Sequence, residues 1–120
     1  MMARILLADD DQGALDFMRR ALEMDGHAVT TADDGIEALG QLGTSQFDVL
    51  VSDVQMPGLD GISLAEKALA QAPALRILMM SGFADVLEKA RGLKSASSVR
   101  FLAKPFAVEQ LRNEIRSLMA

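Results

Sequence analysis

The sequence has no cysteine among its 120 residues. This absence excludes disulfide bonds, thiolate catalysis, and zinc or iron–sulfur sites built from cysteine. The chain also has no apolar run near the roughly 20 residues that a membrane-spanning helix needs. Its first residues, MMARILLADDD, do not form a signal peptide, because the apolar run is short and acidic residues follow it. We therefore expect a chain without a membrane span, located in the cytoplasm.

Basic residues are in the minority, with 12 Lys and Arg against 17 Asp and Glu and a net charge of −5. Such a chain is a poor candidate for direct nucleic-acid binding, which depends on clustered Lys and Arg. The sequence has no G-x-G-x-x-G pattern and no Walker A loop, so no motif indicates a nucleotide-binding domain. The length is that of one domain with its own hydrophobic core.

Short apolar runs alternate with segments of helical periodicity along the chain. The runs are typical of strands buried in a sheet, and the segments between them have apolar residues at helical spacing. Strict alternation predicts right-handed βαβ units and helices on both faces of a parallel sheet. We therefore predict an α/β fold with a doubly wound, five-stranded parallel sheet in the order 2-1-3-4-5, a flavodoxin-like three-layer (βα)5 sandwich. The predicted strands are 4–8, 27–32, 47–53, 76–81 and 99–103, and the predicted helices are 14–26, 34–43, 60–73, 84–93 and 107–119.

Polar side chains stand at the carboxyl ends of four predicted strands, where open α/β sheets bind their ligands. They are Asp9 and Asp10 after the first strand, Asp53 in the third, Ser81 in the fourth and Lys104 after the fifth. Carboxylate oxygens are ligands that suit Mg²⁺. Mg²⁺ beside a lysine suits phosphoryl chemistry, because both cations neutralise oxygens of a transferring group. Asp53 is the best candidate for a nucleophile that forms an aspartyl phosphate.

Four short blocks carry these side chains. They are LLADD (6–10), VSDVQMPGLDG (51–61), MMSGF (79–83) and LAKPF (102–106). Together they resemble the bacterial response-regulator receiver domains of two-component systems, in order and in spacing, over the whole chain. The pattern D-x-x-M-P-x-x-D-G in the second block is highly specific. The resemblance implies that residues 1–120 form one receiver domain without an output domain.

The resemblance implies a phosphoacceptor in signal transduction rather than an enzyme. Asp53 would accept a phosphoryl group from a histidine kinase or a histidine phosphotransfer protein. Mg²⁺, with Mn²⁺ as an alternative, would be held by Asp53, by Asp10 directly, by Asp9 largely through water, and by the backbone carbonyl of Gln55. Lys104 would pair with Asp53 and then with the phosphoryl oxygens, and its peptide bond to the following proline is often cis in the family.

The resemblance also implies a switch made of Ser81 and Phe101. Ser81 would hydrogen-bond the phosphoryl group, and Phe101 would fill the space that Ser81 vacates. The family often has Thr and Tyr at these positions, so this chain lacks a methyl and a hydroxyl group there. We expect a two-state change on the face of the fourth helix, fifth strand and fifth helix, which would contact a downstream protein. Phe83 is expected to shield the acyl phosphate from water.

Three further polar residues have structural interpretations. Asp11 is expected to cap the first helix rather than bind metal, because a carboxylate there accepts free backbone N–H groups. Asp60 is expected to begin the third helix. His27, the one histidine of the chain, is expected to be an ordinary surface residue at the start of the second strand.

Two other functions use related folds. A flavodoxin would bind the phosphate of FMN after the first strand, but DDDQ (9–12) would repel a phosphate unless a metal intervened. A Mg²⁺-dependent phosphatase of the haloacid dehalogenase type also uses an aspartate nucleophile. It has a second acid two residues later, where this chain has Gln55. We therefore expect a phosphate that persists, as suits a signal.

The chain ends with its last predicted helix, so we expect either a stand-alone receiver or a piece of a longer protein. A stand-alone receiver would be a monomer or weak dimer that acts through protein–protein contacts. Its subtype stays open among a flagellar-motor binder, a phosphorelay shuttle and an adaptor. ILLADDD, SGFAD and LAKPF most resemble stand-alone alphaproteobacterial receivers that prime a polar ATP-dependent protease in cell-cycle control.

Overall fold

The computed structural model describes residues 2–82 and 98–120. The predicted helix at 84–93 and Phe83 lie outside these residues. The described part forms a five-stranded parallel sheet in the order β2-β1-β3-β4-β5, as predicted. No helix in this part is long and apolar enough to cross a bilayer. The strands are β1 (Arg4–Ala8), β2 (Ala28–Ala32), β3 (Val49–Asp53), β4 (Arg76–Ser81) and β5 (Val99–Ala103), and the helices are α1 (Gln12–Met24), α2 (Gly35–Thr44), α3 (Gly61–Gln71) and α5 (Val108–Met119).

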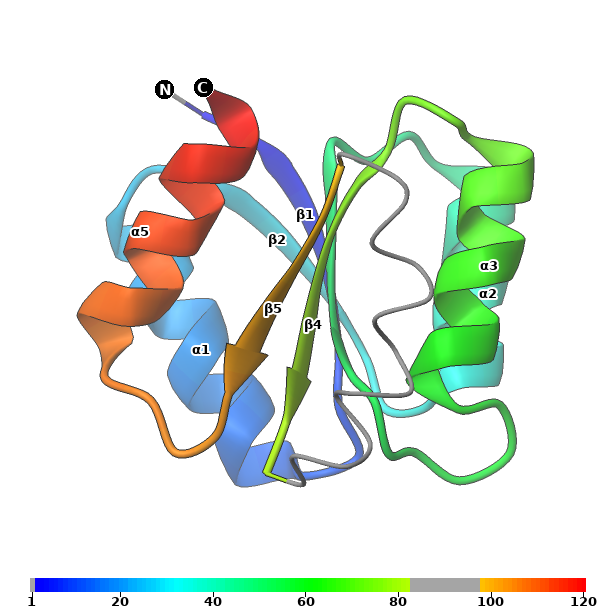
Figure 1. The fold of residues 1–120 in the computed structure, drawn as a ribbon, viewed down its shortest axis with the longest axis horizontal. Coiled ribbons are helices and arrows are strands. Elements are labelled where there is room, and N and C mark those ends of the chain that lie inside the picture. Colours follow the sequence, from blue (N-terminus) through cyan, green and yellow to red (C-terminus); the bar gives the residue numbers. More distant parts are fainter. Residues whose placement is uncertain (1, 83–97) are drawn as a thin grey trace.

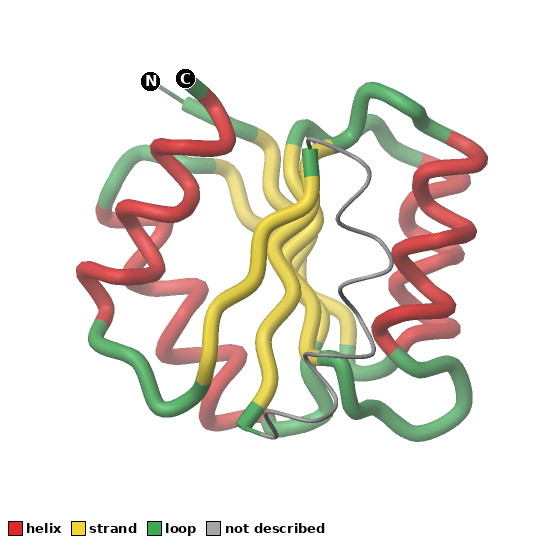
Figure 2. The backbone as a smooth tube through the Cα atoms, in the orientation of Figure 1, coloured by secondary structure: helices red, strands yellow, loops and turns green. Residues whose placement is uncertain are grey.

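The helices form a layer on each face of the sheet (Figure 1). Helices α1 and α5 cover one face, and α2 and α3 cover the other. The strands run side by side through the middle, and the connecting loops gather at the two ends of the strands (Figure 2). Because all strands are parallel, their carboxyl ends share one edge of the sheet, at the bottom of both views. The prediction of a doubly wound fold is confirmed.

The hydrophobic core has two halves, one on each side of the sheet. Ile5 and Leu7 of β1 belong to the half that includes residues of α1 and α5. Leu6 and Ala8 belong to the half that includes residues of α2 and α3. All four side chains are fully buried, and complete burial of one Leu or Ile side chain contributes about 1.5–3 kcal/mol. A strand covered on both faces is therefore apolar at consecutive positions.

Element ends differ from the predicted ones by one to a few residues. Helix α1 begins at Gln12 instead of residue 14, because Asp11 caps it. Strand β3 begins at Val49 instead of residue 47. The residue before it, Asp48, accepts the backbone N–H of Arg4 at 2.8 Å and pairs with its guanidinium at 3.2 Å. Asp48 is therefore engaged by Arg4 at the amino end of the strands, and β3 begins only after it.

His27 ties the start of β1 to the turn before β2. It is half-buried, which corrects the prediction of an ordinary surface residue, and β2 begins one residue later. Its Nδ1 accepts a hydrogen bond from the backbone N–H of Ala3 at 3.0 Å. Burial disfavours the charged imidazole and lowers the pKa of His27, although the carboxylate of Asp25 opposes this shift. The neutral ring is therefore the form that stabilises the fold.

Lowering the pH is expected to weaken this tie. Because the pKa of His27 is lower in the folded chain than in the unfolded one, its contribution is complete above about pH 6.5 and is lost as the pH falls through the folded value. The loss should reach up to about 1 kcal/mol, the contribution of one hydrogen bond. Urea unfolding of the wild type and His27→Gln across pH 5–8 would measure it. A pH dependence that is the same in both proteins would contradict this role.

Candidate functional site

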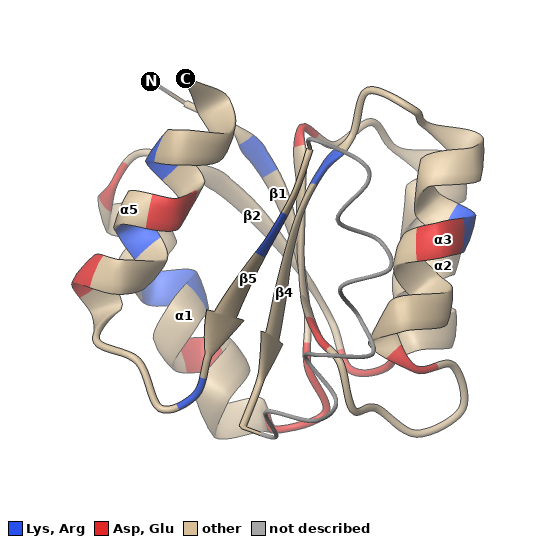
Figure 3. Cartoon of the chain, viewed as in Figure 1, with Lys and Arg blue, Asp and Glu red and all other residues tan. Residues whose placement is uncertain are grey.

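A pocket of about 860 Å³ opens at the carboxyl ends of β1 and β3. Acidic segments gather at this edge of the sheet (Figure 3). Five residues that the sequence suggested for metal binding or phosphoryl transfer line the pocket together, although they come from three segments far apart in the sequence. They are Asp9, Asp10, Asp53, Gln55 and Lys104.

The register of the sheet explains why the carboxylates meet. Ala8 of β1 lies opposite Ser52 of β3. The residues that follow them, Asp9 and Asp53, therefore lie side by side at the carboxyl ends of the two strands. Asp9 is fully buried, Asp53 is half-buried, and Asp10 next to Asp9 is exposed. One carboxylate oxygen of each of the three lies within 4.8 Å of the others. Three anions at this spacing repel one another unless cations lie between them.

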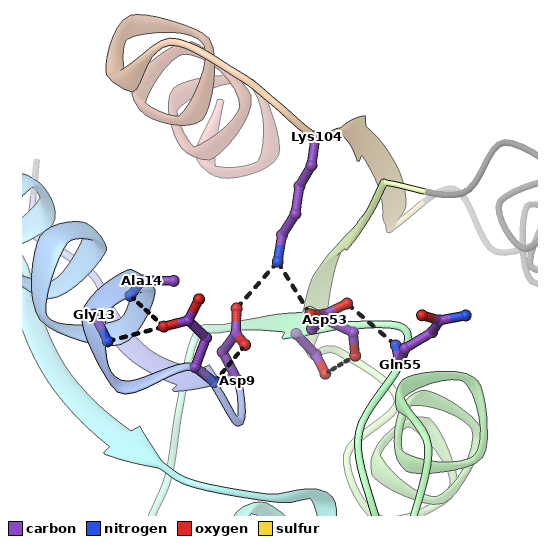
Figure 4. Close-up of polar contacts among 8 residues, drawn as sticks. Asp9, Gly13, Ala14, Asp53, Gln55 and Lys104 are labelled. Atoms are coloured by element: carbon purple, nitrogen blue, oxygen red, sulfur yellow. Dashed lines mark hydrogen bonds and ion pairs between the residues drawn. The ribbon is translucent and has the colours of Figure 1, made fainter.

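Lys104 supplies one positive charge to this cluster (Figure 4). Its Nζ lies 3.0 Å from Oδ2 of Asp53 and 3.2 Å from Oδ2 of Asp9. Its backbone N–H donates to the carbonyl of Ser81 at 2.9 Å, which holds it at the end of the sheet. The peptide bond to Pro105 is cis. Burial lowers the pKa of Lys104, but the hydrogen bonds and charges of the two carboxylates outweigh burial and raise it.

Asp9 is the most constrained of the three acids. Burial raises its pKa, and the charge of Asp53 adds to this effect. The backbone N–H of Asp11, which donates to Asp9 Oδ1 at 3.0 Å, and the ammonium of Lys104 act in the opposite direction. Because the pKa of Asp9 is raised overall, the folded chain without metal holds this carboxylate at a cost.

We therefore expect Asp9→Asn to stabilise the metal-free protein. The amide oxygen can still accept from the N–H of Asp11, while a buried negative charge beside Asp53 is removed. A gain of about 1 kcal/mol would raise the melting temperature by roughly 3–6 °C in a chain of this size. Thermal unfolding in EDTA, followed by circular dichroism, measures the change. An unchanged or lower melting temperature would show that the Lys104 ion pair outweighs the cost of charge.

The carboxylate of Asp53 is held in one orientation. Its Oδ1 accepts the backbone N–H of Gln55 at 3.1 Å, and its Oδ2 faces Lys104. The hydroxyl of Ser52 donates to the backbone carbonyl of Asp53 at 2.9 Å. The side chain therefore points into the pocket with one oxygen toward the loop and one toward the lysine.

Asp11 and Asp60 lie at the same edge but serve helices. Asp11 Oδ1 accepts the backbone N–H groups of Gly13 and Ala14 at 3.0 and 3.2 Å. Asp60 Oδ1 accepts the N–H of Ser63 at 2.9 Å. Both predictions of helix caps are confirmed, because both carboxylates accept backbone N–H groups of the first turn of their helix.

The two residues expected to form the switch lie on neighbouring strands. Ser81 is buried at the end of β4, opposite Ala103 of β5. Phe101 lies opposite Met79 and packs, half-buried, against the core half that includes residues of α2 and α3. Neither side chain lines the pocket of the acids among the residues described.

Sequence reasoning missed part of the pocket wall. Met56, Pro57, Ile62 and Ser63 line it as well. They belong to the loop after β3 and the first turn of α3, which fold over the site. The Pro-Gly pair and the capping Asp60 indicated a tight loop leading into a helix, but no sequence signal showed which of its side chains point inward.

The cluster fits a divalent cation. Its three oxygens are hard ligands within 4.8 Å of one another, and ligands on opposite sides of Mg²⁺ lie about 4.2 Å apart, given bonds of about 2.1 Å. Two of the carboxylates already contact one ammonium group, so one further cation would offset the remaining negative charge. The donor set has the chemistry of a Mg²⁺ or Mn²⁺ site.

Comparison with known proteins identifies relatives of this chain. Residues 5–116 match the response regulator receiver domain family. The chain is 38% identical over 119 residues to the response regulator MprA of Mycobacterium tuberculosis, covering 99% of this chain and 51% of the relative. It thus spans about half the length of the curated relatives it matches.

Solved structures give the same result. The chemotaxis protein CheY4 of Vibrio cholerae superposes with a TM-score of 0.87 and 31% identity, over 98% of this chain and 99% of that one. The receiver domain of Francisella response regulator 1452 gives a TM-score of 0.84 and 36% identity, over 97% and 95% of the two chains. Motifs, fold and relatives agree that this chain belongs to the response regulator receiver domain family.

Proposed function

We propose that Asp53 is the phosphoacceptor of this receiver domain. The observation that carries the proposal is the placement of its Oδ2 3.0 Å from Lys104, in a pocket shared with Asp9 and Asp10. A carboxylate oxygen at a pocket mouth can form a bond to phosphorus, and the adjacent ammonium offsets the charge that gathers on the transferring group.

The transfer exchanges one bond for another. An oxygen of Asp53 attacks the phosphorus of a phosphohistidine on a histidine kinase or phosphotransfer protein. The phosphorus–nitrogen bond breaks, its electron pair stays on the imidazole, and the new phosphorus–oxygen bond makes an acyl phosphate. The backbone N–H of Gln55 holds the other carboxylate oxygen during this step.

Receiver domains bind Mg²⁺ at an acidic pocket, and we propose that this chain does so through Asp9, Asp10, Asp53 and the carbonyl of Gln55. The bound ion would neutralise charge on the phosphoryl oxygens. The protein's own part is to hold the three carboxylates together. Lys104 keeps two of them paired before any ion arrives.

The output would follow from a switch. Ser81, at the end of β4, would turn toward the phosphoryl group, and Phe101 would move into the vacated space. We propose that the surface of β5 and α5 then contacts a downstream protein, together with the predicted fourth helix at 84–93, which lies outside the described residues. Arg100 of β5 and Glu114 of α5 lie on this surface and form a hydrogen-bonded ion pair with each other.

A phosphatase of the haloacid dehalogenase type is disfavoured. Two residues after the nucleophile such an enzyme has an acid, whereas this chain has the neutral, exposed Gln55. Without that acid the acyl phosphate should persist. We therefore propose a signalling domain that assists only its own phosphorylation and dephosphorylation.

Phosphoryl labelling tests this function. The chain should incorporate phosphate from acetyl phosphate, or from a phosphorylated histidine kinase, in the presence of Mg²⁺, and EDTA should prevent it. The label should be stable to neutral gel filtration. Labelling that proceeds equally in EDTA, or rapid release of inorganic phosphate over many turnovers, would overturn the proposal.

A further inference from the structure

We infer that the first turn of α2 positions the loop 54–60, which forms one wall of the pocket. Gly35 and Ile36, the first two residues of this turn, make the contacts with the loop. Neither residue lines the pocket. This inference rests on the proposed function, because it treats the turn as a support for the proposed Mg²⁺ and phosphoryl site. Gly35 is then a positioning residue.

Gly35 is in direct contact with the end of the loop. It is buried, and a Cβ atom built on it would lie 2.1 Å from the backbone oxygen of Leu59 and 2.9 Å from its carbonyl carbon. Both contacts are far inside van der Waals distance, and the backbone cannot swing aside as a side-chain tip can. The helix and the loop can therefore lie this close only while residue 35 has no side chain.

The start of the loop is held in the same way. A Cβ atom on Gly61 would lie 2.1 Å from the backbone oxygen of Asp53, and the N–H of Gly61 donates to the carbonyl of Val54 at 2.8 Å. The first turns of α2 and α3 thus contact the two ends of the loop 54–60. The first turn of α2 contacts Leu59, and the first turn of α3 contacts Val54. Between them lie Gln55 and the other pocket residues of this segment.

Ile36 covers the middle of the loop. Gly58 has a φ of 80°, and a Cβ atom built on it would lie 3.2 Å from Cδ1 of Ile36. Ile36 is 65% exposed, so its contact with Gly58 is not a core contact. The contact with the turn at Gly58 explains why α2 carries the large apolar side chain of Ile36 on its surface.

The segment that leads into α2 is also hydrogen-bonded to the start of α1, next to the residues of the opposite pocket wall. Asp33 accepts a hydrogen bond from Nε2 of Gln12 at 2.6 Å, and its backbone N–H donates to Glu37 at 3.3 Å. Gln12 follows the loop that carries Asp9 and Asp10. This segment and the first turn of α2 thus contact the loop 54–60 and the first residue of α1, which comes directly after the loop with Asp9 and Asp10, and so they link the two segments that hold the proposed metal ligands.

The test compares two substitutions in one helix. Gly35→Ala is expected to weaken Mg²⁺ binding about tenfold, the lower end of the effect seen when groups that orient metal ligands are altered. Gly40→Ala is the matched control, because Gly40 lies exposed in α2 with nothing within 4 Å of its pro-Cβ position. Calorimetric titration with Mg²⁺ measures the dissociation constant, and excess Mg²⁺ should restore phosphoryl labelling in Gly35→Ala.

A second variant decides the matter if Gly35→Ala does not fold. Ile36→Ala removes an exposed side chain, and its Mg²⁺ affinity should fall roughly threefold with an unchanged melting temperature in EDTA. Wild-type Mg²⁺ affinity in Ile36→Ala, or in a folded Gly35→Ala, would overturn the inference and leave the proposed function standing. Absence of Mg²⁺ binding by the wild type would contradict the proposed function itself.

Discussion

Replacing Asp53 by Asn is expected to abolish phosphoryl incorporation. The amide would occupy the same place beside Lys104 but has no anionic oxygen to form a bond with phosphorus. The rate should fall by at least about a thousandfold, the scale of the loss when an enzyme is deprived of its nucleophile. The measurement is the initial rate of label uptake from acetyl phosphate at saturating Mg²⁺.

Asp60→Asn is the matched control for this loss. Asp60 also lines the pocket, but its carboxylate caps α3 through the N–H of Ser63, and Asn caps a helix about as well as Asp. This variant should be labelled at a rate near that of the wild type. Equal labelling of Asp53→Asn and the wild type would show that another residue accepts the phosphate.

Mg²⁺ is expected to raise the melting temperature of the wild type substantially. An ion that binds only the folded chain stabilises it by about 2.7 kcal/mol at one hundred times its dissociation constant. The effect arises because Asp9, Asp10 and Asp53 face one another with one lysine between them. Thermal unfolding with Mg²⁺, and with NaCl at equal ionic strength, separates binding from screening.

Asp10→Ala should remove most of this stabilisation. Asp10 is exposed, so its truncation leaves no cavity, and the metal-free chain should not be destabilised because a repulsive charge is lost. The matched control is Asp11→Asn, which keeps the cap of α1 and should retain the full Mg²⁺ effect. A Mg²⁺-induced rise in melting temperature that is the same in Asp10→Ala and the wild type would exclude Asp10 as a ligand.

The sheet and the meeting of the acids could be predicted because each depends on local pattern. Consecutive apolar residues such as Ile5 to Ala8 mark strands covered on both faces, and parallel strands bring their carboxyl ends to one edge. Asp9 and Asp53 each directly follow or end such a strand, so their proximity follows from topology. Helix caps such as Asp11 were predictable for the same reason, since capping is decided within one turn.

Contacts between distant segments were not predictable from pattern. Lys104 contacts Asp9 as well as Asp53, and this depends on how far a flexible side chain reaches from the end of β5 across β4 and β3. The contact of Gly35 with the backbone of Leu59 depends on the approach of a helix to a loop. The partial burial of His27 was not predicted, because its hydrogen-bond partner, the N–H of Ala3, is a backbone group that no side-chain pattern reveals.

Peptide mapping of the phosphorylated protein tests the central claim most directly. The wild type is treated with acetyl phosphate and Mg²⁺, digested, and analysed by tandem mass spectrometry. We predict modification of a single residue, Asp53, that depends on Mg²⁺. A phosphoryl group on Asp9, Asp10 or His27 instead, or an unmodified Asp53 peptide under conditions that label the protein, would contradict the account.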